Sequence, residues 1–145
     1  MRIYLDVCCL NRPFDDQSQT RVRDETLAVQ AILDAVDRGL HDLVGSQMMR
    51  IELKAIRDVV RRRKVRALLP AKLLALDDAV HRRARELMVQ GFRAADAVHV
   101  AAAERIAADV LVTTDDRLAR RGKRLAKRLR VRVADVLSFV EELQG

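Results

Sequence analysis

The sequence is poor in the residues that several common kinds of site require. Aromatic residues make up only 3% of its 145 residues, which predicts an aliphatic core and leaves few rings on which nucleic acid bases could stack. No apolar run is long enough to span a bilayer, and Met1 leads directly into a strand pattern without a signal peptide. We therefore expect a cytoplasmic protein that does not enter a membrane.

Motifs for covalent catalysis and for phosphate binding are also missing. The two cysteines, Cys8 and Cys9, are adjacent, which disfavours a disulfide, and neither a Cys-x-x-Cys motif nor a histidine partner suggests zinc. The Gly-x-Ser-x-Gly pattern of serine hydrolases is absent, as are glycine-rich phosphate loops. The chain thus offers no motif for a covalent nucleophile, and we expect reduced, buried thiols.

What the sequence has in excess is positive charge. A net charge of +7 favours a polyanionic partner, nucleic acid before membrane. The bases gather in residues 50–66 and 117–132, and the second run holds nine bases and no acid. Most charge runs are solvated helix faces, but two in a chain of this length favour a binding surface. The nucleic-acid contacts expected within the second run are Arg117, Arg120, Arg121, Lys123 and Arg124.

Hydrophobic periodicity predicts an α/β fold. Strand patterns cover residues 1–6, 42–46, 109–113 and 131–133, and helical patterns fill most of the intervening chain. Ser46 is expected to cap a helix that continues through the basic residues 57–66, and Pro70 to start another that Gly91 ends. Residues 11–20 read as a loop. We expect one domain, residues 1–145, with a parallel sheet of four to five strands between two layers of helices.

Five acidic residues can meet at one edge of such a sheet. Asp6, Asp115 and Asp116 follow strands, and ligands bind beyond the carboxyl ends of parallel strands. Asp96 lies in the first turn of an alanine-rich helix, and Glu52 borders the buried face of another.

Two neighbours of these acids have simpler interpretations. His99, one turn after Asp96, is more typical of a packed or hydrogen-bonded helix residue than of a base, and we leave it out of the site. Tyr4 is expected in the core with its hydroxyl satisfied.

Clustered carboxylates call for a cation. Two charges about 5 Å apart repel by roughly 3 kcal/mol at an effective dielectric of 20, so either their pKa values rise or a cation binds. Oxygen-only ligands, without histidine or cysteine, suit a hard cation such as Mg²⁺ or Mn²⁺. Such a site is typical of phosphodiester hydrolysis, in which the ion activates water and screens the charge on the phosphate.

The stretches Ile3-Tyr4-Leu5-Asp6, Ala95-Asp96-Ala97-Val98-His99 and Thr113-Thr114-Asp115, in this order, resemble a PIN domain, and within that family the VapC-type toxins of bacterial toxin–antitoxin pairs. The resemblance implies a metal-dependent endoribonuclease. Its catalytic residues would be Asp6, Glu52, Asp96 and Asp115, with Asp6, Asp96 and Asp115 on the metal and Glu52 orienting a water or a second ion. Thr113 would support the site, and Asp116 would be an auxiliary ligand or a helix N-terminal charge. An antitoxin partner and a homodimer are also implied.

Other functions stay open at this point. A haloacid dehalogenase phosphatase needs a second Asp where Cys8 stands, and the layout does not match a phospho-receiver domain. The strongest alternative is a basic nucleic-acid-binding PIN-like module with a degenerate, non-catalytic site. It is favoured by Val7, which stands where the resembled subgroup commonly has Asn.

Overall fold

The computed structural model describes all residues, Met1–Gly145, and places a four-stranded parallel sheet at the centre of the molecule. The strands are β1 (Arg2–Leu5), β2 (Asp42–Val44), β3 (Val110–Thr113) and β4 (Arg132–Asp135), in the spatial order β2-β1-β3-β4. Every neighbouring pair is parallel. The predicted α/β fold with helices on both faces of a parallel sheet is confirmed.

The two central strands are buried on both faces because both are continuously apolar. Ile3, Tyr4 and Leu5 in β1 are fully buried, and Val110 to Val112 in β3 are at most 1% exposed. This is the pattern of parallel strands covered by helices on each side. The edge strands β2 and β4 each begin with an exposed charged residue, Asp42 and Arg132.

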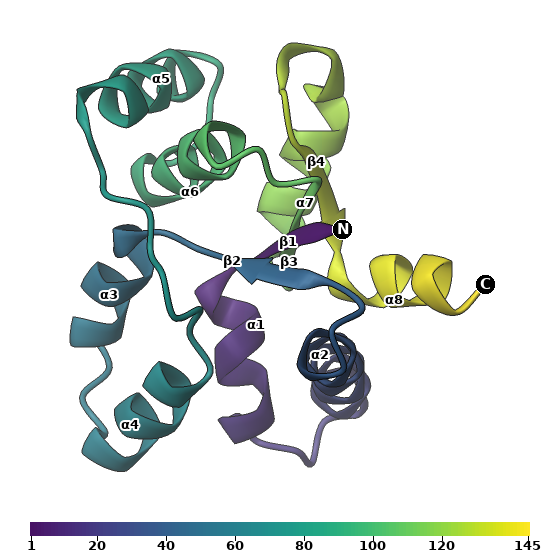
Figure 1. Cartoon of the computed structure of the whole chain (residues 1–145). Helices are drawn as coiled ribbons and strands as arrows, with labels where there is room; N and C mark the ends of the chain where they lie inside the picture. Colours follow the sequence, from purple (N-terminus) through teal and green to yellow (C-terminus); the bar gives the residue numbers. More distant parts are fainter.

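Helices cover the two faces of the sheet unequally (Figure 1). The long helix α2 (Thr20–Asp37) and the C-terminal helix α8 (Val136–Gln144) lie together on one side. On the other side lie α5 (Asp78–Val89), α6 (Ala94–Arg105) and α7 (Asp116–Arg124). Two further helices, α3 (Gln47–Lys54) and α4 (Val59–Ala67), lie beyond the carboxyl end of β2. No helix of the chain is both long enough and apolar enough to cross a membrane.

The segment after β1 is more regular than its polar sequence predicted. A short helix, α1 (Val7–Asn11), begins directly after Asp6, and a 3-10 turn, η1 (Arg12–Phe14), follows it. The expected loop over residues 11–20 is therefore wrong at its start. Val7, Cys9 and Leu10 are buried, so tertiary packing stabilises a helix too short to be stable alone.

The basic helix predicted to continue through residues 57–66 is instead two helices. Asp58 Oδ1 accepts hydrogen bonds from the backbone N–H groups of Val60 and Arg61 and so caps a new helix, α4. The helix predicted from Pro70 is also wrong over residues 70–77. There the chain bends at Ala71 and Lys72, and Leu74 then forms a single bridge to the backbone of Gly45 and Gln47 beside the sheet. A second turn, η2 (Ala126–Arg128), follows α7.

Candidate metal centre

Asp6 stands at the carboxyl end of the central strand β1, where the fold directs it towards the neighbouring strand β3. Thr113, the last residue of β3, donates from Oγ1 to Asp6 Oδ2 over 2.9 Å. The same hydroxyl oxygen accepts the backbone N–H of Asp115 over 3.0 Å. Asp6 is only 7% exposed. One buried hydroxyl therefore links the carboxylate of Asp6 to the turn that carries Asp115.

The two carboxylate oxygens of Asp115 have different surroundings. Its Oδ1 accepts hydrogen bonds from the backbone N–H groups of Arg117 and Leu118, at 2.8 and 3.3 Å, and so caps helix α7. Its Oδ2 makes no hydrogen bond within the protein and is free for a ligand. The N-cap role explains why an acid stands between β3 and α7, and it also fixes the orientation of the carboxylate.

Asp96 is brought to this cluster by helix α6. Its side chain is half-buried in the first turn of the helix. Burial raises the pKa of Asp96 to about 6, and the negative charges of Asp6 and Asp115 add to the rise, against the lowering effects of His99 and Arg93. Asp6 and Asp115 therefore lie near enough to Asp96 to disfavour its charged form.

Glu52 reaches the cluster from helix α3 through His99, whose sequence pattern was that of an ordinary helix residue. Its Oε1 accepts a short hydrogen bond from His99 Nε2, and the same nitrogen lies 3.9 Å from Asp6 Oδ1. One potential ligand atom from each of Asp6, Glu52 and His99 lies within 4.8 Å of the others. His99 is hydrogen-bonded, as expected, but it lies inside the site.

The pKa of His99 reflects two opposing effects. Burial lowers it, because an imidazolium is poorly solvated inside the protein. The hydrogen bond to Glu52 and the negative charges of Asp6, Glu52 and Asp96 outweigh burial, so the pKa of the imidazole is raised. A sequence signal for this residue existed: His99 follows Asp96 by three positions, and positions three apart share one face of a helix.

Behind His99, two buried hydroxyl groups continue the hydrogen bonding. The hydroxyl of Tyr4 lies 2.6 Å from His99 Nδ1 and 2.7 Å from Ser46 Oγ. Tyr4 is thus a core residue with a satisfied hydroxyl, as predicted. Ser46 also caps α3, as predicted, by accepting the backbone N–H of Met48 over 3.3 Å.

Asp116 lies outside the carboxylate cluster. Its two oxygens accept hydrogen bonds from the guanidinium of Arg21 in α2, at 2.6 and 3.0 Å, and this contact lowers the pKa of Asp116. Arg21 also lies 3.5 Å from Glu25, which is buried and paired with Arg12. In this arrangement Asp116 is a helix N-terminal charge that ties α7 to α2.

The basic residues of α7 do not form one surface. Arg117, Arg120, Lys123 and Arg124 are exposed and make no ion pair, which leaves their charges available to an anion. Arg120 and Lys123 line a cavity of about 800 Å³ against β4 and α8. Arg121 is half-buried, and its Nε is a buried donor without a partner. Its side chain points towards Gly91, because a Cβ at Gly91 would lie 3.7 Å from that nitrogen.

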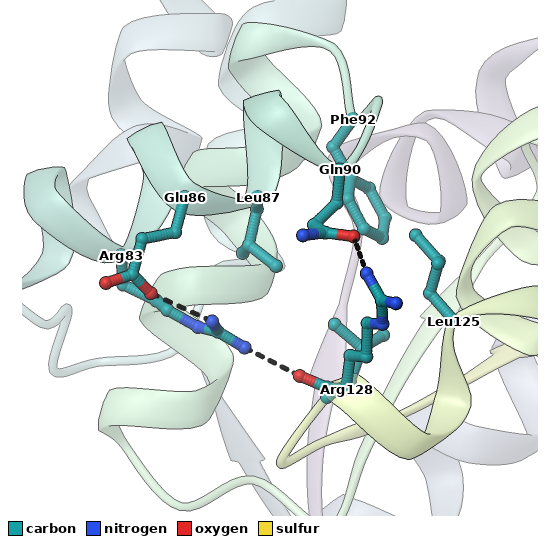
Figure 2. Close-up of a pocket in the computed structure, with 8 residues that line it drawn as sticks. Arg83, Glu86, Leu87, Gln90, Phe92, Leu125 and Arg128 are labelled. Carbon is teal, nitrogen blue, oxygen red and sulfur yellow. Dashed lines mark hydrogen bonds and ion pairs between the residues drawn. The ribbon is translucent and has the colours of Figure 1, made fainter.

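A separate cavity of about 310 Å³ lies between α5 and the segment after α7 (Figure 2). Its rim is closed by polar contacts: Arg83 donates to the backbone oxygen of Arg128 over 2.8 Å, and Arg128 donates to Gln90. Leu87, Phe92 and Leu125 form its apolar wall. None of Asp6, Glu52, Asp96 and Asp115 lines this cavity, so the cavity is separate from the candidate metal centre.

The acidic cluster has the composition expected of a site for a divalent cation. Asp6 and Asp115 disfavour the charged form of Asp96, and Glu52 stands beside Asp6 together with the imidazole of His99. A divalent cation would relieve that repulsion, and carboxylate oxygens are the ligands that Mg²⁺ and Mn²⁺ accept.

Comparisons with known proteins agree with the fold. A comparison with curated protein sequences found no match. Among solved structures, the chain is similar to a member of the VapBC family of toxin–antitoxin systems, VapBC-5, from Mycobacterium tuberculosis. The TM-score is 0.53 at 18% sequence identity, and the match covers 92% of this chain and 98% of the other. The sequence model of the PIN domain matches residues 3–124. PIN domains are generally nucleases, and the chain belongs to the PIN domain family.

Proposed function

We propose that the chain is a metal-dependent endoribonuclease that acts as a single PIN domain. The observation that carries the proposal is the group of Asp6, Glu52 and His99, which lie far apart in the sequence and place one potential ligand atom each within 4.8 Å of the others. The raised pKa of Asp96, to which Asp6 and Asp115 contribute, supports it. RNA as the substrate follows from the resemblance to VapC-type toxins.

In this proposal Asp6, Asp96 and Asp115 hold Mg²⁺ or Mn²⁺. The bound ion supplies a Lewis acid that activates water for attack on phosphorus and offsets the charge that gathers on the phosphate. Thr113 keeps one oxygen of Asp6 oriented through its 2.9 Å hydrogen bond. Glu52, which is half-exposed, would orient the attacking water. Hydrolysis would form a bond from the water oxygen to phosphorus and break the phosphorus–ester oxygen bond, with the proton released by the water ending on the leaving oxygen.

The exposed bases of α7 would bind phosphates flanking the scissile bond. Arg117 follows Asp115 by two residues in the first turn of α7, so its backbone lies at the edge of the site. Contacts of this kind position a nucleic acid without reading its sequence, and they weaken with salt. Few aromatic side chains are available to stack on bases, so backbone contacts and RNA shape would dominate binding.

The proposed activity is tested with a fluorescently labelled single-stranded RNA, with and without Mn²⁺. We expect cleavage that EDTA abolishes, that Asp6→Asn abolishes, and that the matched control Asp116→Asn retains, because Asp116 pairs with Arg21 outside the cluster. DNA of the same sequence tests the choice of RNA. Metal-independent RNA binding without cleavage would contradict the proposal and support the degenerate, non-catalytic module instead.

We also propose a toxin role with a cognate antitoxin as protein partner. Support comes from the similarity to a protein described as a member of a toxin–antitoxin family. Expression of the chain alone in a bacterium should arrest growth, and Asp6→Asn should relieve the arrest. Unchanged growth with a chain that cleaves RNA in vitro would leave a nuclease without a toxin role. A homodimer is part of the same proposal, and sedimentation at several concentrations measures it.

A further inference from the structure

The buried groups behind Glu52 form a continuous series of hydrogen bonds that the proposed reaction does not use. The series runs from Ser46 Oγ to the hydroxyl of Tyr4 (2.7 Å), then to His99 Nδ1 (2.6 Å), and from His99 Nε2 to Glu52. Ser46 and Tyr4 are fully buried, and His99 is 1% exposed. Only the last member, Glu52, reaches solvent, with 32% of its side chain exposed.

For a neutral imidazole, counting donors and acceptors allows only one arrangement of the hydrogens along the series. Glu52 as a carboxylate can only accept, so His99 Nε2 carries the hydrogen and donates to it. With the imidazole neutral, Nδ1 accepts from the hydroxyl of Tyr4, which accepts in turn from the hydroxyl of Ser46. Ser46 accepts the backbone N–H of Met48. Each hydroxyl then donates once and accepts once, which leaves no buried polar group of this series unsatisfied.

The series also closes a ring through helix α3. Ser46 caps the start of the helix, and Glu52 extends from its second turn. The helix is thus tied at its first turn to Tyr4 in β1, and at Glu52 to His99 in α6. A Glu side chain on a half-exposed helix has three rotatable bonds, and without these contacts it would sample many positions. Here one oxygen, Oε1, is held, and Oε2 is left for the site.

We propose that His99, Tyr4 and Ser46 are positioning residues that hold the carboxylate of Glu52 against the metal centre. The inference rests on the proposed function, since it gives Glu52 its place in that site. His99 acts through Glu52 and not as a metal ligand, because its Nε2 is directed at Glu52 Oε1 and carries a hydrogen. Groups of this kind behind metal ligands affect metal affinity or activity by about 10- to 100-fold.

A double-mutant cycle in RNA cleavage with Mn²⁺ tests the inference. Tyr4→Phe removes only the hydroxyl and should lower kcat by about 10-fold with little change in KM for RNA. His99→Leu should lower kcat further, whereas His99→Gln should recover part of the loss, because its amide can still donate to Glu52. In a Glu52→Gln background, Tyr4→Phe should have almost no added effect. Additive effects of the two substitutions would overturn the inference.

Controls separate positioning from loss of structure. Thr26→Val removes a buried hydroxyl in α2, away from the site, and His81→Leu makes the His99→Leu change at an exposed position. Neither should change kcat. Thermal unfolding shows that each variant is folded. If Tyr4→Phe or His99→Leu does not fold, His99→Gln and Ser46→Ala carry the test through the same cycle with Glu52→Gln.

Metal binding provides a second readout that does not depend on cleavage. Calorimetry with Mn²⁺ should show weaker binding for His99→Leu than for His99→Gln, and pulsed electron paramagnetic resonance should show no imidazole nitrogen bound to Mn²⁺. A nitrogen coupling lost in His99→Gln would make His99 a ligand and overturn the positioning role. Binding equal in all variants would overturn the inference alone. No Mn²⁺ binding by the unmodified protein would overturn the proposed function and this inference together.

Discussion

Thr113 donates its hydroxyl hydrogen to Asp6 Oδ2 over 2.9 Å, and this contact joins the ends of the two central strands at the acidic cluster. The side chain of Thr113 is fully buried, so no water can replace its hydroxyl without rearrangement. The contact fixes which oxygen of Asp6 remains free to face Glu52 and His99.

Replacing Thr113 by Val should therefore weaken Mn²⁺ binding by about 10- to 100-fold with the fold retained. The substitution keeps the shape but leaves Asp6 Oδ2 and the backbone N–H of Asp115 without their shared partner. Calorimetry with Mn²⁺ measures the change. Thr114→Val is the matched control, because the neighbouring hydroxyl makes no hydrogen bond within the protein. Equal binding by both variants would show that the hydroxyl of Thr113 is dispensable.

The raised pKa of Asp96 makes stability depend on pH. Its pKa rises from an ordinary value of 3.8 to about 6, so the folded protein holds this proton more tightly than the unfolded chain does. The group therefore contributes stability that is fully present below about pH 4 and is lost as the pH rises through about 6. The neighbours that act on Asp96 are Asp6, Asp115, His99 and Arg93.

Asp96→Asn should raise the free energy of unfolding of the metal-free protein at pH 7. We expect about 1 kcal/mol, because the half-exposed side chain is partly screened by solvent. Urea unfolding in EDTA between pH 4 and 8 measures the effect, and the variant should lose less stability over this range. Asp24→Asn, on the exposed face of α2, is the control. Parallel pH profiles for Asp96→Asn and the unmodified protein would contradict the prediction.

Metal binding should show the opposite pH dependence. A cation competes with the proton on Asp96, so affinity for Mn²⁺ should fall as the pH drops through about 6. Calorimetry at pH 5 and pH 7.5 compares the two conditions. Affinity that is the same at both values would mean that Asp96 does not ligate the ion.

Arg83 secures helix α5 to α6 through Glu104, which is 3% exposed (Figure 2 shows Arg83). Arg83 Nε donates to Glu104 over 2.7 Å. Arg83→Met would leave a buried carboxylate with only the backbone N–H of Arg130 as donor, and should cost about 3 kcal/mol of stability. Urea unfolding measures the loss. Arg82→Met, an exposed neighbour, should change stability by less than about 0.5 kcal/mol, and similar losses in both would reject the mechanism.

Gly122 allows α7 to approach β4 closely. A Cβ at this position would lie 2.5 Å from Cβ of Val133, so any larger residue must push the helix away from the strand. Gly122→Ala should therefore destabilise the protein by about 2 kcal/mol, and Lys123→Ala should not.

Adding Val133→Ala to Gly122→Ala should cost less than the sum of the single changes, because it removes the atoms that clash. Thermal unfolding of the unmodified protein, the two single variants and the double variant measures this difference. Full additivity would show that the helix and strand do not compete for this space.

Much of the fold could be predicted because its signals are local. The apolar runs at residues 3–5 and 110–112 allowed only buried strands, and the order of strands and helices favoured a parallel sheet. The missed features depend on distant partners. The residues after Pro70 are not helical, and Leu74 pairs with the backbone beside Ser46, a contact that no local pattern indicates.

The sequence by itself determined which acids end strands or begin helices, and the topology of a parallel sheet then predicts that such residues gather at one edge. Only the tertiary structure decided what each acid faces. Asp116 is adjacent to Asp115 in the chain, yet its carboxylate pairs with Arg21 in α2. His99 had the pattern of an ordinary helix residue, yet it lies between Tyr4 and Glu52. A side chain's electrostatic environment is set by charges close in space, and the fold alone brings those charges together.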